Sequence, residues 1–151
     1  MTATYNDVRA AIEGRIATQM AVNPAYPVAY GNVPFTPPNN TPWVQAQLRF
    51  GDNTYATLLP TGSVGYNRQT GTVTLNVFTP IGNGAAANYT IAERLKDLFD
   101  RQTVSGIIFD AASGPAQVGA GVLESGASAS SALAVAYFQT QLTITFEAYL
   151  Q

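Results

Sequence analysis

The chain has 151 residues, a net charge of −2, no cysteine and no histidine. Its length suits one domain with one core, which we place over residues 1–151. The missing residue types exclude disulfides, thiol nucleophiles, a histidine general base and most zinc sites. We therefore expect a protein that is not an enzyme and that uses no cofactor and no metal.

The charged residues make up 11% of the chain, against roughly 25% in typical soluble domains. No lysine or arginine follows Arg101, and no basic patch offers a site for nucleic-acid phosphates. We therefore expect no specific nucleic-acid binding. No apolar run approaches the ~18 residues of a membrane span, so we expect no membrane association either. Thr, Asn, Gln and Ser carry the polarity instead, which favours a strand-rich protein partly covered by partners, although a monomer could also have this composition.

The first expected element is a helix over residues 4–20. Its apolar residues recur every four positions and fall on one face, namely Val8, Ile12, Ile16 and Met20. Thr4 and Asp7 resemble a capping box with a shorter acid in place of glutamate. Pro24 and Pro27 then stop the helix and open a long loop.

Four prolines punctuate the segment that leads into Trp43, namely Pro34, Pro37, Pro38 and Pro42. The fixed φ of proline lowers the entropy that is lost when a loop is held in one shape. Such a loop is either a passive strap over the core or a shaped docking surface. The residues of the loop alone leave both possibilities open.

Alternating residues predict a strand over 43–50, with Trp43 and Arg49 on the polar side. The residues 51–53 are typical of a turn, and a second strand is expected over about 54–59. A further turn region over 65–71 precedes a strand over 72–79. Three consecutive strands with short links indicate an antiparallel meander.

The second helix is expected to start from a capping box of Thr90 and Glu93. Its apolar face consists of Ile91, Leu95, Leu98 and Phe99. A short strand over 104–110 follows, and residues 111–133, rich in Gly, Ala and Ser, predict a flexible excursion.

Residues 136–150 alternate as a long final strand. Phe138 and Leu142 are expected on its inner side and Tyr137 on its outer side. The fold class that results is α+β, with a mainly antiparallel sheet and two amphipathic helices packed on one face. The other face is rich in amides and hydroxyls and is either wet or shared with a neighbour.

Candidate chemistry is sparse. The carboxylates favour a solvated helix surface over a catalytic pair, and the glycines at 82–84 favour a turn over a phosphate loop, because they lack the rest of that motif. Asp52 and Asn53 indicate a turn rather than calcium. Trp43 is either a core aromatic or an interface anchor, and Arg49 and Arg68 are either solvated or contact residues.

Two motifs together resemble a known family. "NVPFTPP" precedes an aromatic-led strand, and "YNRQTGTVTLNVFTPIGNG" is followed by an amphipathic helix and late strands. In this order they resemble the tail terminator or tail completion proteins of long-tailed bacteriophages. Residues 111–133 depart from the pattern, since they are longer and richer in Gly, Ala and Ser.

The resemblance implies a virion structural protein that forms a homo-hexameric ring on the head-proximal end of the tail tube. Such a ring stops tube polymerisation and presents a surface to the neck or connector protein. It meets the sheath protein in contractile tails, and DNA passes through it. The alternatives are another neck protein, such as a head-completion or connector adaptor, and more distantly a carbohydrate-binding module built on Trp43.

Three contact regions are expected from these considerations. They are the proline loop with Trp43, the turn that contains Arg68, and the segment 111–133. With the resemblance, we interpret the proline loop as a stiff strap whose inner side, with Phe35, belongs to the core and whose outer side touches the next subunit or the tube. The candidate interface residues toward a second subunit or the tail tube are Phe35, Pro37, Pro38, Trp43, Arg49, Tyr66, Asn67 and Arg68.

Overall fold

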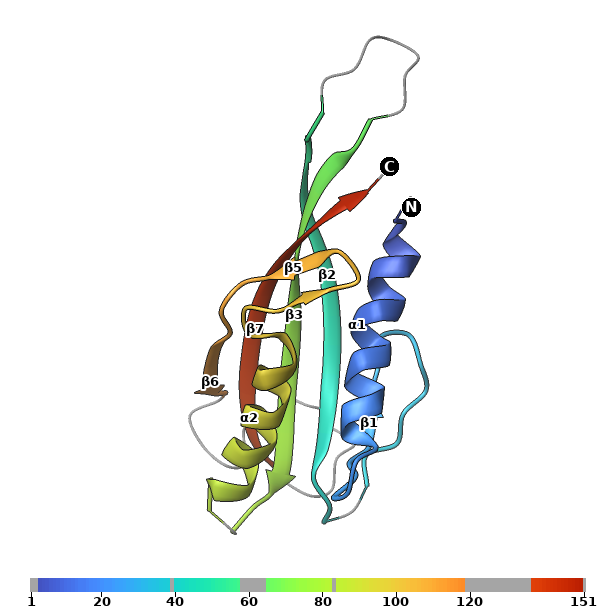
Figure 1. Ribbon diagram of the computed structural model, residues 1–151. Helices are drawn as coiled ribbons and strands as arrows, with labels where there is room; N and C mark the ends of the chain where they lie inside the picture. Colours follow the sequence, from blue (N-terminus) through green and yellow to red (C-terminus); the bar gives the residue numbers. More distant parts are fainter. Residues whose placement is uncertain (1–2, 39, 58–64, 83, 119–136, 151) are drawn as a thin grey trace.

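The structure is a computed structural model that describes residues 3–38, 40–57, 65–82, 84–118 and 137–150. Within them the chain forms two helices and a mostly antiparallel seven-stranded sheet, with both helices in front of one face (Figure 1). The α+β prediction is confirmed. In chain order the elements are α1 (Tyr5–Met20), β1 (Val28–Ala29), β2 (Trp43–Tyr55), β3 (Asn67–Pro80), α2 (Ala86–Phe99), β4 (Thr103–Val104), β5 (Ile107–Phe109), β6 (Ser113–Gln117) and β7 (Tyr137–Leu150).

Helix α1 begins as its sequence predicts. The Asp7 backbone N–H donates to Thr4 Oγ1 at 3.2 Å, and the Thr4 backbone N–H donates to Asp7 Oδ2 at 2.8 Å. These bonds form a capping box that satisfies two orphan donors. The side-chain and backbone hydrogen bonds from Thr4 hold the pKa of Asp7 below its ordinary value of 3.8.

Strands β2 and β3 form one long antiparallel hairpin rather than two strands of a three-stranded meander. The expected turn at 51–53 is wrong, because β2 runs through it to Tyr55. The expected turn over 65–71 is wrong from Asn67 onward, because β3 starts there. The last residues of the second expected strand, 58–59, lie outside the described part of the chain.

A β-bulge explains why turn-type residues lie inside β2. Phe50 pairs with Gly71 and Asn53 with Gln69, so β2 carries one more residue than β3 between these pairs. The buried Gln69 side chain fills the irregularity, and its Nε2 donates to the Gly51 carbonyl at 2.9 Å. The carbonyls freed by the bulge are thus satisfied by a side chain instead of a turn.

Helix α2 starts one turn earlier than expected, and the capping box at Thr90 is wrong. Thr90 Oγ1 donates to the Ala86 carbonyl at 2.9 Å inside the helix, and the N-cap Ala85 makes no side-chain bond. Alanines 85–87 favour helix intrinsically. The buried Asn88 fixes this end, because its Nδ2 donates to the carbonyls of Val77 at 3.0 Å and Phe138 at 3.2 Å.

The last part of the chain is more regular than its composition indicates. The strand expected over 104–110 is two short strands, β4 and β5, joined at Ser105 and Gly106, both with positive φ. Strand β6 lies within the expected flexible excursion and pairs with β7, so that expectation is wrong for Ser113–Gln117. Residues 119–133 of the excursion lie outside the described residues.

The main core lies between the two helices and the sheet. Four α1 side chains, the inward rows of β2, β3 and β7, and the apolar face of α2 form one buried cluster. Of the expected α2 face, Leu98 is only partly buried, and Ala92 and Asn88 are buried in addition. The alternation expected for β7 is confirmed from Leu142 to Leu150.

The sheet has two unlike edges. Its order is β1-β2-β3-β7-β5-β4, with β6 also pairing β7. Strand β1 covers β2 only at Val44 and Gln45. The far edge of β7 is covered by β5 and β6. Most of β2 is therefore a bare edge on one side, while short strands cover the other.

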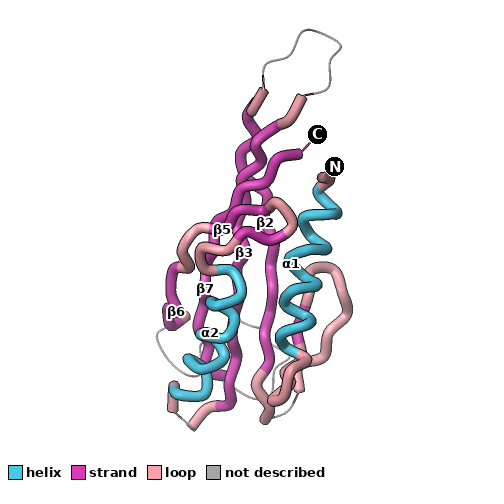
Figure 2. Tube along the Cα trace, in the orientation of Figure 1, coloured by secondary structure: helices cyan, strands magenta, loops and turns pink. Residues whose placement is uncertain are grey.

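The β2–β3 hairpin extends past the helices at one end of the molecule, near both chain termini (Figure 2). The termini meet there, since Ala3 forms a parallel bridge to Leu150. Every described residue of β2 from Gly51 onward is exposed. This projecting segment consists of the described residues 51–57 and 65–69, and we call it the arm.

Candidate functional site

Four aromatic rings form a second, smaller core on the sheet face opposite the helices. Trp43 stacks on Phe78 with ring centroids 4.1 Å apart and an interplanar angle of 7°. The Tyr137 ring meets the Trp43 ring edge-on with centroids 6.1 Å apart, and the Phe35 ring lies with its centroid 5.1 Å from that of Trp43. Only 4% of Trp43 is exposed. Of its two expected roles, the structure assigns the core role.

The proline loop is a strap over this aromatic cluster. Phe35, Pro37 and Pro38 are half-buried, and the Tyr137 hydroxyl donates to the Pro38 carbonyl. Tyr137 was expected on the outer side of its strand and is indeed on the face away from the helices, but the strap buries it. The outer residues Asn32, Val33, Pro34 and Thr36 are exposed. The inner side of the strap thus belongs to a core, as expected for Phe35.

Burial of the indole bears on the carbohydrate-binding alternative. An aromatic platform for a sugar must present its face to solvent, and both neighbouring rings of Trp43 lie against it. Its indole N–H finds no acceptor among the described residues. Trp43 is therefore not available as a sugar-stacking platform in this conformation.

Beyond the aromatic cluster, the same sheet face carries a network of side-chain amides. Asn76 lies at its centre, where its Nδ2 donates to Gln45 Oε1 at 3.1 Å. Gln139 and Gln141 both donate to Asn76 Oδ1, at 3.3 and 3.2 Å. The side chains brace three strands against each other on the sheet face away from the two helices, where Asn76 and Gln139 are buried. This is the amide-rich face that the alternation predicts.

The base of the arm holds the remaining predicted contact residues. Tyr66 is 41% exposed, Asn67 is half-buried and begins β3, and Arg68 is exposed. Arg68 is not unpaired: its Nε donates to Glu147 Oε2 at 2.6 Å, which raises the pKa of Arg68. Tyr55, which the sequence does not single out, is 82% exposed on the opposite strand of the arm.

Arg49 lies on the bare edge strand β2, on the amide-rich face. It is exposed and makes no ion pair with any described residue. Its neighbours across the sheet are Thr72 on β3 and then Thr145 on β7. Of the predicted positive contact residues, Arg49 is thus the one whose charge is not paired within the described chain.

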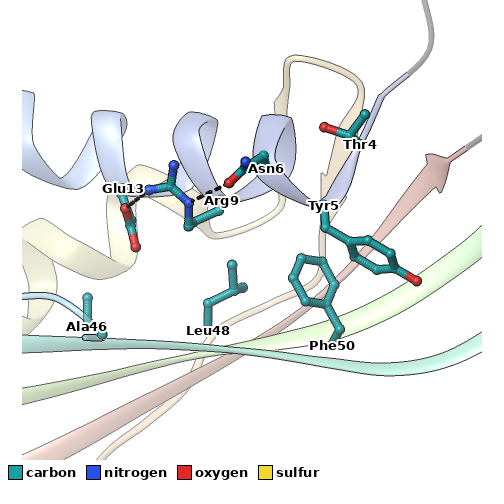
Figure 3. A pocket seen from close by; sticks show the side chains of 9 residues that line it. Thr4, Tyr5, Asn6, Arg9, Glu13, Ala46, Leu48 and Phe50 are labelled. Atoms are coloured by element: carbon teal, nitrogen blue, oxygen red, sulfur yellow. Dashed lines mark hydrogen bonds and ion pairs between the residues drawn. The ribbon is translucent and has the colours of Figure 1, made fainter. Parts of the chain in front are cut away.

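A groove runs between α1 and the bare edge of β2 (Figure 3). Its volume is about 610 Å³. Ala46, Leu48 and Phe50 form the floor, and the ion pair of Arg9 with Glu13, at 2.5 Å, lies on the α1 side. Nothing in the sequence marks this groove, because it depends on β1 ending after two residues.

The predicted site residues thus lie in three separate places rather than one. They are the strap over the aromatic cluster, the bare β2 edge and the base of the arm. In the described ranges no group of three or more His, Cys, Asp or Glu side chains could hold a metal ion. No helix among the described residues is long and apolar enough to cross a membrane.

Comparison with known protein families gives a match to the sequence. A family whose description is "Phage tail terminator protein" matches residues 7–105, which is more than half of the chain. The chain belongs to this phage tail terminator family. The match begins inside α1 and ends between β4 and β5, so it contains the strap, the bare edge strand and the arm.

Known structures support the fold of this tail terminator family member. A solved protein structure whose name states no function has 21% sequence identity and a TM-score of 0.65. The alignment covers 95% of this chain and 94% of that chain. At this identity the likeness shows the fold alone, and the alignment extends beyond residue 105, where the family match ends. No curated protein matches the sequence.

Proposed function

We propose that this chain assembles into a homo-hexameric ring that caps the head-proximal end of the phage tail tube. The ring stops tube polymerisation and gives the neck or connector protein its docking surface. In a contractile tail it also meets the sheath protein. The observation that carries the proposal is membership of the tail terminator family, which matches residues 7–105.

The surface of the subunit supports an assembly role. The amide-rich face lies away from both helices, most of the β2 edge is unpaired by described strands, and the arm exposes Tyr55 and Tyr66. A ring of identical subunits needs two different patches on each copy, and the two unlike sheet edges meet that need. The protein acts by binding and blocking, without catalysis and without a cofactor.

Three parts of the subunit make the contacts in this proposal. The outer side of the strap and the bare edge with Arg49 contact neighbouring copies. The arm, with Tyr66, Asn67 and Arg68 at its base, reaches toward the last ring of the tail tube. DNA passes through the lumen without specific binding.

The proposal is tested by locating the protein on the particle. A virus carrying an affinity tag on this chain is purified, labelled with gold particles, and imaged by negative-stain electron microscopy. We expect one cluster of label at the junction of tail and head. Label along the whole tube or at the distal tip, or particles that lack the protein altogether, would overturn the proposal.

A further inference from the structure

One row of side chains crosses the amide-rich face from edge to edge. Arg49 pairs with Thr72, and Thr72 pairs with Thr145. Directly paired residues of a sheet share a face and a level along the strands. At the far end of the row, Thr145 Oγ1 donates to Asp110 Oδ2 at 2.8 Å, and the Asp110 N–H donates to the Thr145 carbonyl at 2.9 Å.

The two ends of this row carry opposite charges that cannot meet within one subunit. Three inter-strand spacings separate Arg49 from Asp110, which is about 14 Å. Neither residue has an ion-pair partner within 4.0 Å among the described residues. The Arg68 guanidinium is bonded to Glu147, and the charge of Asp110 acts on Arg68 without forming an ion pair within 4.0 Å. The row thus ends in an exposed positive charge on β2 and an exposed negative charge beside β7, and the exposed Arg101 lies next to the negative end, where its N–H donates to the Asp110 carbonyl at 3.4 Å.

Ring symmetry brings such edges together. Copies in a closed ring are related by a pure rotation, which preserves the level of each residue along the ring axis. When the strands run along that axis, the β2 edge of one copy meets the edge formed by β4, β5 and β6 of the next copy at the same level. We propose that Arg49 of one copy forms an ion pair with Asp110 of the next copy, across a seam between these two edges. The inference rests on the ring of the proposed function and names its subunit contact.

The main chain at the seam supports a second copy as the occupant. The Val44 N–H donates to the Pro27 carbonyl at 3.0 Å, away from β3. By alternation along the strand, the N–H and C=O groups of Ala46, Leu48 and Phe50 also point away from β3. The groups of Leu48 and Phe50, which lie beyond the register of β1, make no backbone bond to any described residue, although bare apolar edges are usually protected. A neighbouring copy would cover this edge beside the groove of Figure 3.

The opposite edge is shaped differently at the same level. Phe109 pairs with Phe146, which lies level with Phe50 through Gly71. Ser113 pairs with Thr143 and lies level with Gln47. The stretch 109–113, flanked at Phe109 and Asp110 by residues 101–102, therefore lies level with residues 47–50 of the next copy. Pro115 in β6 has no N–H to donate, which disfavours pairing of this edge with the same edge of another copy. The seam is heterologous, as a ring requires.

A charge exchange in assembled tails tests the seam. Tails are purified from viruses whose chain carries Arg49→Asp, Asp110→Arg, or both changes, and the copies retained per tail are measured by quantitative mass spectrometry. We expect a loss of roughly tenfold or more for each single variant and recovery to near the wild-type level for the double variant. Asp97→Arg, an equal charge change on the exposed surface of α2, serves as the control and should retain the protein.

Cysteine cross-linking provides a test that does not depend on the strength of the seam. The chain has no cysteine of its own, so Arg49→Cys with Asp110→Cys introduces one defined pair. Oxidised tails carrying the double variant should give a ladder of covalent oligomers, and each single variant should give none. Dimers from Arg49→Cys alone would show a two-fold contact and overturn the inference.

The outcomes separate this inference from the proposed function. Wild-type protein absent from the tails would defeat both. Wild-type protein present in the tails, with no rescue by the charge exchange and no ladder from the paired cysteines, would defeat the seam and leave the capping role standing. Rescue together with a ladder would establish the seam.

Discussion

Gly71 lies where β3 passes directly beneath an aromatic ring of β7. A Cβ atom at this position would lie 2.3 Å from Phe146 Cζ and 2.8 Å from the Arg49 carbonyl oxygen. The glycine therefore allows close approach of a ring and a neighbouring backbone, not a turn. Gly51, on the adjacent strand, has a different environment, because its added Cβ would meet the movable Thr70 Oγ1 at 3.2 Å.

We expect Gly71→Ala to lower the free energy of unfolding by about 1–3 kcal/mol, because the ring and the strand must both shift. Gly51→Ala should cost less, since a side chain can rotate away. Urea unfolding followed by far-ultraviolet circular dichroism measures both. Equal effects of the two substitutions would contradict the close-packing explanation. Addition of Phe146→Leu to Gly71→Ala should recover part of the loss.

At the scale of the elements, periodicity was informative where one face of an element meets a single core. The four-residue spacing in α1 and the alternation in β7 from Leu142 onward follow this rule, and both were predicted correctly. The long hairpin was not predicted, because residues 51–53 have the composition of a turn. They form a bulge instead, whose carbonyls accept hydrogen bonds from the distant Gln69 side chain.

The site was less predictable than the fold for a similar reason. Trp43 and Arg49 both alternate onto the polar side of β2, and local sequence cannot tell them apart. The strap and Phe78 bury the first, while the short length of β1 leaves the second exposed. Asp110 has no sequence signal as a contact residue, because its relation to Arg49 exists only through the register of three strands.

The arm is the element with the most exposed aromatic surface. Tyr55 and Tyr66 lie on its two strands and are 82% and 41% exposed. We expect Tyr55→Ala with Tyr66→Ala to change the free energy of unfolding by no more than about 0.5 kcal/mol per site, as exposed positions usually do.

The same double variant should sharply reduce the yield of infectious particles in a complementation assay, because the arm contacts the tail tube in the proposed assembly. Tyr89→Ala removes a comparably exposed tyrosine from α2 and is the matched control. Normal particle yield from the arm variant would remove the arm from the contact surface.

For the whole molecule, the arrangement of layers explains why so much surface is left for partners. Both helices cover one face of a single sheet, so the other face keeps its amides, its strap and its uncovered row from Arg49 to Asp110. The two sheet edges differ in length, cover and charge. Such a subunit has a closed core on one side and unlike surfaces at its edges, which suits repeated head-to-tail contact.

The central claim, that the protein stops growth of the tail tube, is tested most directly by tail length. Tails are assembled by a virus from which the gene has been deleted, and their lengths are measured by negative-stain electron microscopy beside tails from a strain that supplies the protein in trans. We expect tubes longer than wild type and of variable length, with the normal length restored by complementation. Tubes of normal length that lie beside unattached heads would contradict a terminating role and would assign the protein to the connector instead.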